Sequence, residues 1–329
     1  MTSMPTGVHR RLDDLPFLGL AAALCCGLAF PTWFSPYFGW TGILLQFIFF
    51  TSGLRIDARA IFSELRDMKL FAAVSLFRLV VFPLFVYLLA VVFFPHLMMP
   101  LVLLAAMPAG MTSPLFVDMV RGNVPLALFL TAGTSLLSVI TLPIILGLLG
   151  GESTVFDPWM IFRTLLFIMA VPIALAQAVR AFPFGRDLIV KGQSLSRFSS
   201  ILALWLLIGT IASKNSAAIR SGFVGSDALT AFLIMSGLLV LFHLACYAIG
   251  FWRSRRDRIT VTLSLSYMNF TLAIFLAETL FRDPAAMLVV ILSMLPWNIG
   301  LIVFQWLVRR KGWMISSDTE RKEKPAFAG

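Results

Sequence analysis

Long apolar runs, separated by short polar or charged segments, occupy almost all of this chain of 329 residues. A helix that crosses a bilayer needs about 20 predominantly apolar residues. The runs predict ten such helices, at residues 15–34, 38–54, 70–94, 97–120, 124–149, 160–178, 198–218, 228–252, 259–280 and 287–308. The pattern therefore predicts an all-α membrane protein that crosses the bilayer many times.

The composition supports this interpretation. Hydrophobic residues make up 59% of the chain and charged residues only 13%, whereas soluble globular proteins carry about 25% charged residues. A soluble chain of this size would need far more polar surface to cover its core. The composition excludes a soluble enzyme, a disordered protein and a disulfide-built secreted module, and it makes the lipid bilayer the expected environment.

The basic residues indicate an orientation. The net charge is +10, but most Lys and Arg lie in short clusters between apolar runs, so we expect no nucleic-acid partner. With the N-terminus inside, 21 of the 26 Lys and Arg residues fall in cytoplasmic segments and 3 in the opposite ones. Lys and Arg favour the cytoplasmic side of membrane proteins. We expect an integral protein of the cytoplasmic or plasma membrane with both termini cytoplasmic.

The helix count divides the chain into two halves of five. Because each half contains an odd number of spans, the second half begins on the opposite side of the membrane from the first. This is the arrangement of inverted repeats in secondary transporters. We expect a first five-helix repeat at residues 1–150, a second, inverted five-helix repeat at residues 151–308, and a basic cytoplasmic tail at residues 309–329.

The fourth and ninth predicted helices (residues 97–120 and 259–280, called helices 4 and 9) have the most helix-breaking or polar residues at mid-membrane depth. Pro108, Gly110 and Pro114 interrupt helix 4, and polar residues between 264 and 271 occupy the centre of helix 9. Lipid cannot satisfy the backbone groups that an interruption exposes, so broken helices persist where they line a cavity. We expect the two broken helices to cross beside a polar pocket. The alternative is two kinked helices packed by small residues.

Short motifs spread over most of the chain carry a resemblance to a known family. They are Gly53-Leu54-Arg55, Pro83, the run from Met107 to Ser113, Arg121-Gly122-Asn123-Val124, the run from Thr131 to Pro143, and Asn269 with Leu272-Ala273. Together they resemble the bile acid:sodium symporter family, whose distant relatives include arsenite efflux carriers. The resemblance implies a core domain of helices 3, 4, 5, 8, 9 and 10 beside a four-helix panel of helices 1, 2, 6 and 7. Substrate would bind between the two units, and their relative rotation would give alternating access.

The chain departs from the family at its sodium sites. The resemblance implies two cation sites built from Ser, Asn, Thr, Gln and Glu side chains, and Ser113 and Thr131 match that pattern. The other ligand positions hold Pro114, Ala127, Ser264, Met268 and Arg78. A permanent positive charge and the loss of the carboxylate disfavour a sodium ion. We expect a degraded sodium site, with Ser113 and Thr131 as remnants, no other cofactor, and transport that does not depend on sodium.

The residues at the predicted crossing are the candidates for substrate contact: Arg78, Thr112, Ser113, Thr131, Ser264 and Asn269. An arginine within a span usually faces protein or water and has a partner. We interpret Arg78 as an anion contact or as half of an ion pair, for which the family's architecture suggests Asp118; snorkelling to the membrane edge is the alternative. Asp118 is also a candidate proton-binding site or a solvated carboxylate at the cytoplasmic edge.

These features favour a secondary transporter of a small organic anion over an enzyme. The sequence has no Walker A motif and no Cys or His cluster with metal-ligand spacing. It also lacks the fourth-helix cysteine on which the arsenite carriers depend, which argues against arsenite. The alternative is an integral-membrane sensor or enzyme that uses the same cavity. The solute, the direction of transport, the coupling ion and the oligomeric state stay open.

Overall fold

The computed structural model describes residues 19, 22–56, 68–150, 157–217, 226–281 and 284–310, which form helices and contain no strand. In chain order the helical segments are α2 (Pro31–Phe34), η1 (Ser35–Trp40), α3 (Thr41–Arg55), α5 (Met68–Leu76), η3 (Phe77–Val81), α6 (Phe82–Phe93), η4 (Pro95–Leu97), α7 (Met98–Ala106), α8 (Ser113–Met119), α9 (Val124–Leu149), α10 (Pro158–Leu165), η5 (Leu166–Ala170), α11 (Val171–Ala181), α12 (Pro183–Lys214), α14 (Ser226–Ile249), α15 (Arg255–Ser266), α16 (Phe270–Leu276), η6 (Ala277–Phe281) and α17 (Pro284–Arg310). The all-α prediction is confirmed.

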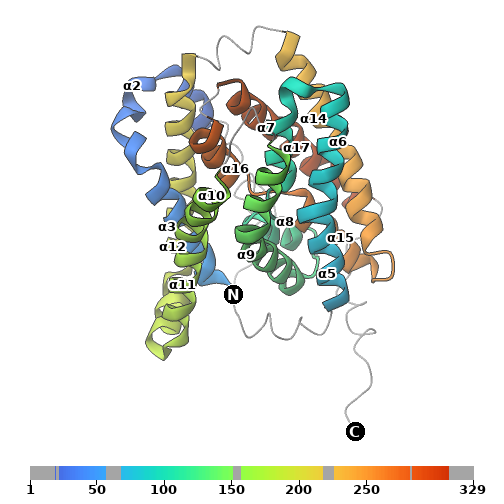
Figure 1. The fold of residues 1–329 in the computed structure, drawn as a ribbon. Coiled ribbons are helices and arrows are strands. Elements are labelled where there is room, and N and C mark those ends of the chain that lie inside the picture. Colours follow the sequence, from blue (N-terminus) through green and yellow to red (C-terminus); the bar gives the residue numbers. More distant parts are fainter. Residues whose placement is uncertain are drawn as a thin grey trace.

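The helices form two groups that lie side by side (Figure 1). In the first group, α3 packs against both α11 and α12, and α2 packs against α12. In the second group, α14 packs against α15 and α17, α6 packs against α7, and α15 packs against α8 and α9. The two groups meet where α10 and η5 contact α9 and where α16 contacts α3 and α12.

Within the described residues, seven helices are long and apolar enough to cross a membrane, where the sequence predicts ten spans. They are Pro31–Arg55, Met68–Phe93, Val124–Leu149, Pro158–Ala181, Ser194–Lys214, Phe232–Ile249 and Val289–Val308. The predicted spans 97–120 and 259–280 are each interrupted, so neither contains one long helix. Of the predicted span 15–34, residues 22–29 and 31–34 are helical, while residues 15–18, 20 and 21 lie outside the described residues, as does the predicted tail beyond residue 310.

One predicted boundary is wrong. The sequence places a basic connector before residue 198, but α12 is helical from Pro183 onwards. Proline is favoured in the first turn of a helix, and the Lys, Arg, Leu and Gln residues that follow have good helix propensity. Hydropathy detects only the apolar part of such a helix. As a result, Arg197 belongs to the same rigid element as the apolar residues after it.

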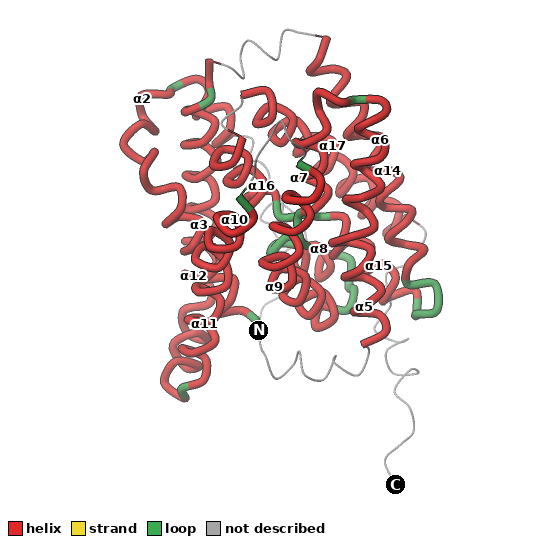
Figure 2. Tube along the Cα trace, viewed as in Figure 1, coloured by secondary structure: helices red, strands yellow, loops and turns green. Residues whose placement is uncertain are grey.

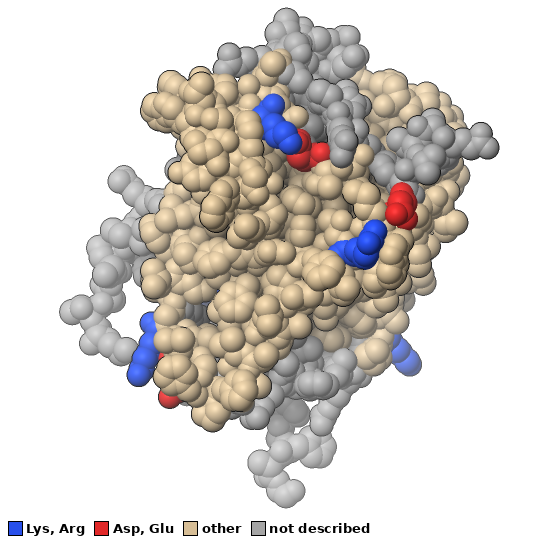
Figure 3. All heavy atoms as spheres, turned by 60° about the vertical axis from the view of Figure 1, so that its left-hand side comes forward, with Lys and Arg blue, Asp and Glu red and all other residues tan. Residues whose placement is uncertain are grey.

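The outer surface suits a lipid environment. Large apolar side chains such as Trp33, Leu88, Val92 and Leu148 are more than 60% exposed. On the face drawn in Figure 3, Lys, Arg, Asp and Glu side chains are few, and uncharged residues cover a wide band between them. Apolar surface on this scale is costly in water. Together with the seven apolar helices, it marks a multi-pass membrane protein.

The interruptions of α7–α8 and α15–α16 lie against each other at the centre of the molecule (Figure 2). Gly110 N donates to the Tyr267 carbonyl over 2.6 Å, and Asn269 N donates to the Pro108 carbonyl over 2.9 Å. Ala109 and Met268 thereby form an isolated antiparallel bridge. Each unwound segment thus satisfies backbone groups of the other, which lipid could not do. We call these two segments, residues 107–112 and 267–269, the crossing.

Candidate functional site

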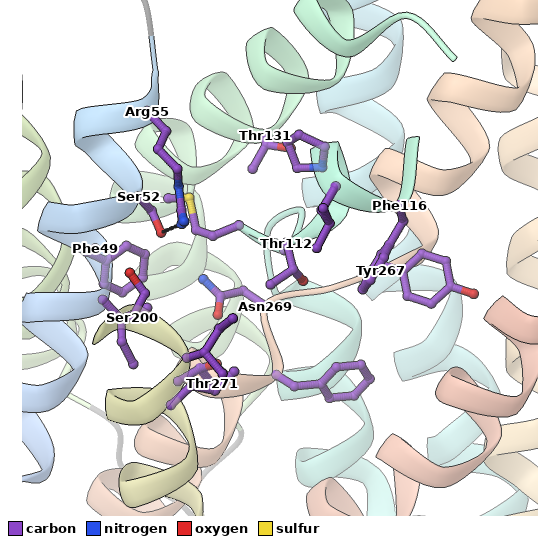
Figure 4. Close-up of a pocket in the computed structure, with 18 of the residues that line it drawn as sticks. Phe49, Ser52, Arg55, Thr112, Phe116, Thr131, Ser200, Tyr267, Asn269 and Thr271 are labelled. Atoms are coloured by element: carbon purple, nitrogen blue, oxygen red, sulfur yellow. Dashed lines mark hydrogen bonds between the residues drawn. The ribbon is translucent and has the colours of Figure 1, made fainter. Parts of the chain in front are cut away.

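A cavity of about 610 Å³ lies beside the crossing, between the two groups of helices. One wall comes from α3 and α12, and the other comes from α8, α9, α16, α17 and the crossing itself. Figure 4 shows Ser52, Arg55 and Ser200 on the first side and Thr112 and Tyr267 on the second. The cavity therefore occupies the boundary between elements that could move relative to one another.

The lining is mostly apolar with a few polar groups. Apolar surface comes from side chains such as Phe49, Met294 and Trp297, and hydroxyl groups come from Thr112 and Thr131. Such a lining, with a small number of polar groups that fix orientation, is typical of sites for small organic molecules. Within the described residues, no group of three or more His, Cys, Asp or Glu side chains could hold a metal ion.

The predicted site residues divide into two sets. Thr112, Thr131, Asn269 and Asp118 line the cavity. Arg78, Ser113 and Ser264 are fully buried and do not line it. A single sequence motif contains both Thr112 and Ser113, but α8 begins at Ser113 and turns the serine towards α9.

Arg78 lies behind the crossing rather than in the cavity. Its Nη1 donates to the Ala105 carbonyl over 2.6 Å, near the C-terminal end of α7. The guanidinium carbon lies 5.0 Å from the ring centre of Phe242 and 6.0 Å from that of Phe82. Carbonyl groups at a helix C-terminus carry partial negative charge. The contact to Ala105 thus places the arginine charge where the broken helix exposes that end.

The predicted ion pair between Arg78 and Asp118 is not formed. Both residues belong to the described part of the chain, and no salt bridge joins them there. Arg78 is fully buried, whereas Asp118 is exposed near the end of α8. The snorkelling alternative for Arg78 is wrong as well, because the guanidinium stays inside the protein. That Asp118 binds a proton during transport stays a prediction.

The residues present do not fit a sodium site. Ser113 Oγ and Thr131 Oγ1, the two predicted remnants, lie 2.9 Å apart and share a hydrogen bond with each other. Thr134 Oγ1, one turn along α9, accepts from Ala109 N and donates to the Leu130 carbonyl. These hydroxyls are engaged within the protein, and no Asp or Glu side chain of the described residues is hydrogen-bonded to them. Hard cations require several free oxygen ligands.

Sequence reasoning missed the charged side chains that line the cavity from α3 and α12. Arg55 and Arg197 both belong to the lining, but each stands at the edge of an apolar run and is explained there by the topology rule alone. The Arg55 position within the Gly53-Leu54-Arg55 motif was a usable signal. For Arg197 there was none, because the helix that positions it starts outside the apolar run.

Comparisons with known proteins agree with this architecture. A sequence model of the SBF-like CPA transporter family matches residues 16–312, which is most of the chain. The protein named "Uncharacterized protein YbaS" from Bacillus subtilis is 26% identical over 224 residues, covering 66% of this chain and 68% of that protein. The motif resemblance to bile acid:sodium symporters is confirmed at the level of the family.

Two further relatives are named as transporters. "Probable sodium/metabolite cotransporter BASS3, chloroplastic" from Arabidopsis thaliana is 27% identical over 187 residues, which is 53% of this chain and 41% of that protein. "Sodium/bile acid cotransporter 7" from Danio rerio is 31% identical over 148 residues, which is 43% of this chain and 44% of that protein. The matches thus span less than half the length of these two relatives.

Proposed function

Because the chain belongs to the SBF-like CPA transporter family, we propose that it is a secondary transporter that carries a small organic anion by alternating access. The finer architecture is part of the proposal: ten membrane helices in two inverted repeats, with α3, α11 and α12 in the panel and the crossing in the core. The panel would rotate against the core, and both termini would be cytoplasmic.

The observation that carries the proposal is the position of the cavity. It lies between the α3–α12 wall and the crossing, where two unwound segments meet inside the protein. Interrupted helices at the middle of a membrane transporter mark the substrate site. A cavity between two helix groups can change its accessible side when the groups move, which a cavity within one rigid group cannot do.

Contacts at the other end of α12 support alternating access. Lys214 at the end of α12 forms an ion pair with Glu278 in η6, and Asn215 Nδ2 donates to the same carboxylate over 2.9 Å. Neither Lys214 nor Glu278 lines the cavity, whose charged lining among the described residues is Arg55, Asp118 and Arg197. In the proposed orientation, the ion pair closes the outer side while the cavity opens to the cytoplasm.

Counterflow in proteoliposomes tests the proposal. Vesicles loaded with unlabelled taurocholate, p-toluenesulfonate or 4-phenylbutyrate should transiently accumulate the same labelled compound for at least one of the three. A sensor or an enzyme gives no counterflow, so its absence with all three compounds would overturn the proposal.

The same assay tests the coupling ion. Although the relatives are named sodium cotransporters, we expect equal initial rates in sodium and in choline. Ser113 and Thr131 are hydrogen-bonded to each other, and Ser264 stands where the family resemblance implies a glutamate. Strict dependence on sodium would contradict this expectation.

The Lys214–Glu278 ion pair gives a second prediction. In a Glu278→Gln variant, the outward-open population should rise by about 1.4- to fivefold, because measured ion pairs of this exposure contribute about 0.2–1 kcal/mol. Thr271 lines the cavity, so the measurement is the labelling of a Thr271→Cys variant by an impermeant maleimide added outside, in a background whose three native cysteines are alanine. Glu278→Asp keeps the charge and serves as the control. Labelling that stays unchanged in Glu278→Gln would exclude the pair as an outer closure.

A further inference from the structure

Arg55 on α3 and Arg197 on α12 lie on one wall of the cavity, close to a hydrogen bond that links the two helices. Ser200 Oγ on α12 and Thr51 Oγ1 on α3 share a 2.7 Å hydrogen bond. Arg55 follows Thr51 by four residues, and Arg197 precedes Ser200 by three. Residues three or four apart lie on the same face of a helix. Because the helices run antiparallel, both arginines lie at the same end of the cavity, which they both line.

The end of α3 is held so that Arg55 keeps its position. Gln177 Nε2 on α11 donates to the Gly53 carbonyl over 2.8 Å, and Arg180 Nη1 donates to the Leu54 carbonyl over 2.7 Å. The last carbonyl groups of a helix lack intrahelical partners. These bonds satisfy them and fix the last turn of α3, so the Arg55 side chain starts from a rigid backbone.

Both guanidinium groups keep donors available. Arg55 donates to Ser52 Oγ over 2.9 Å (Figure 4), and the Arg197 side chain forms no hydrogen bond or ion pair with another described residue. A guanidinium carries five N–H donors. Asp118 is the one Asp or Glu among the described lining residues, so the charged lining has a net positive charge. Two neighbouring cations are stabilised when an anion binds between them.

A further donor lies at the crossing. Asn269 is 5% exposed and lines the cavity. Its Oδ1 accepts from Leu272 N over 3.0 Å, which caps α16, while its Nδ2 has no hydrogen-bond partner. A buried donor without an acceptor is costly. An acceptor atom on a bound solute would remove that cost.

We propose that Arg55 and Arg197 form an anion-binding pole of the cavity, and that the solute is an amphipathic organic anion. Its carboxylate or sulfonate binds at the pole, a second acceptor atom meets Asn269, and its apolar body packs against Phe49 and Trp297. Arg–oxyanion contacts are charge-assisted and frequently bidentate, which makes arginine better suited to this role than lysine. The inference rests on the proposed transport function, because it assigns the substrate class of the same cavity.

Binding of matched charged and neutral probes tests the pole. The purified full chain in a neutral detergent is titrated with p-toluenesulfonate and 4-phenylbutyrate, and with their neutral isosteres p-toluenesulfonamide and 4-phenylbutyramide. We expect the anions to raise the unfolding midpoint and the amides to have little effect. Equal shifts from anions and amides, or no shift from any anion, would overturn the pole.

Variants locate the binding. Arg55→Gln and Arg197→Gln should each weaken anion binding about tenfold, the range for losing one charge-assisted hydrogen bond. Asp118→Asn should strengthen it, because a like charge is removed. Arg310→Gln is the matched control, since Arg310 is exposed over the Trp306 ring and does not line the cavity. Because Arg197 is also exposed, its variant is expected to fold even if Arg55→Gln does not.

The outcomes separate this inference from the transport function. Counterflow and binding that survive in Arg55→Gln and Arg197→Gln would refute the pole while leaving transport intact. Anion binding that both variants lose, without counterflow in the wild type, would refute transport while leaving the pole intact. If dioleoylphosphatidylglycerol raised the unfolding midpoint as much as p-toluenesulfonate does, the pole would be assigned to a lipid headgroup. That result would overturn the assignment of the pole to a solute.

Discussion

Reversing the charge of Arg78, in an Arg78→Glu variant, should destabilise the protein more than any other single change considered above. The side chain is fully buried, its Nη1 donates to the Ala105 carbonyl at 2.6 Å, and aromatic rings face the guanidinium. A carboxylate there meets another acceptor and the negative end of α7, with nothing to pair it. An uncompensated buried charge costs about 3–5 kcal/mol, which should prevent extraction of a folded monodisperse protein.

Arg78→Lys is the matched control for this prediction. Lysine keeps the positive charge and a donor for the Ala105 carbonyl, so the unfolding midpoint should fall far less than in Arg78→Glu. Because Arg78 does not line the cavity, affinity for p-toluenesulfonate should stay within about twofold of wild type, the scatter expected without a direct contact. A midpoint for Arg78→Glu equal to wild type would show that the crossing does not need this cation. A loss of affinity for p-toluenesulfonate in a stable Arg78→Lys variant would show that Arg78 contributes to the substrate site.

Adding a single methyl group at Gly110 should disrupt the crossing. A Cβ atom there would lie 2.9 Å from the carbonyl oxygens of both Met268 and Tyr267, and the obstacle is backbone rather than a flexible side chain. The backbone cannot retreat without breaking the 2.6 Å hydrogen bond from Gly110 N to the Tyr267 carbonyl. Overpacking of this kind costs about 1–3 kcal/mol, and it separates the two segments that border the cavity.

The measurement is a pair of assays on Gly110→Ala, the unfolding midpoint and counterflow, with Gly237→Ala as control. Gly237 lies within α14, and a Cβ atom there would meet nothing within 4 Å. An alanine in a helix interior is favoured over glycine, so the control should keep both its stability and its counterflow. Wild-type behaviour in Gly110→Ala would mean that the two unwound segments are not held together as tightly as the distances imply.

The lengths of the apolar runs and the composition were sufficient to predict the class of this protein. Apolar runs of about 20 residues have few alternatives to membrane helices, because only helices and closed barrels satisfy their backbone in lipid. The interruption of helix 4 was also predictable from Pro108 and Pro114, since proline removes a backbone donor and clashes with the preceding turn. These are local properties, and a single chain segment contains all the information that they require.

The candidate site was predictable only in part. Thr112 and Asn269 were identified from their positions at the interruptions, and Thr131 and Asp118 from the resemblance to the family; all four line the cavity. Arg78 was assigned to the same site because a charged residue in a span suggests function, but whether it faces a cavity or a helix end depends on packing against α7 and α14. Spacing along the chain could not decide whether Arg78 pairs with Asp118, and the structure shows that it does not.

The amino-acid sequence by itself determined that this chain is helical, spans a membrane and interrupts two helices near their middles, because propensity and hydropathy act over short stretches. Only the tertiary structure decided which polar groups share a cavity. Arg55 and Arg197 are 142 positions apart in the numbering, and the Thr51–Ser200 hydrogen bond between α3 and α12 brings them together. Contacts of this kind form when packing fixes the distance and rotation of two helices, which no pattern within either helix specifies.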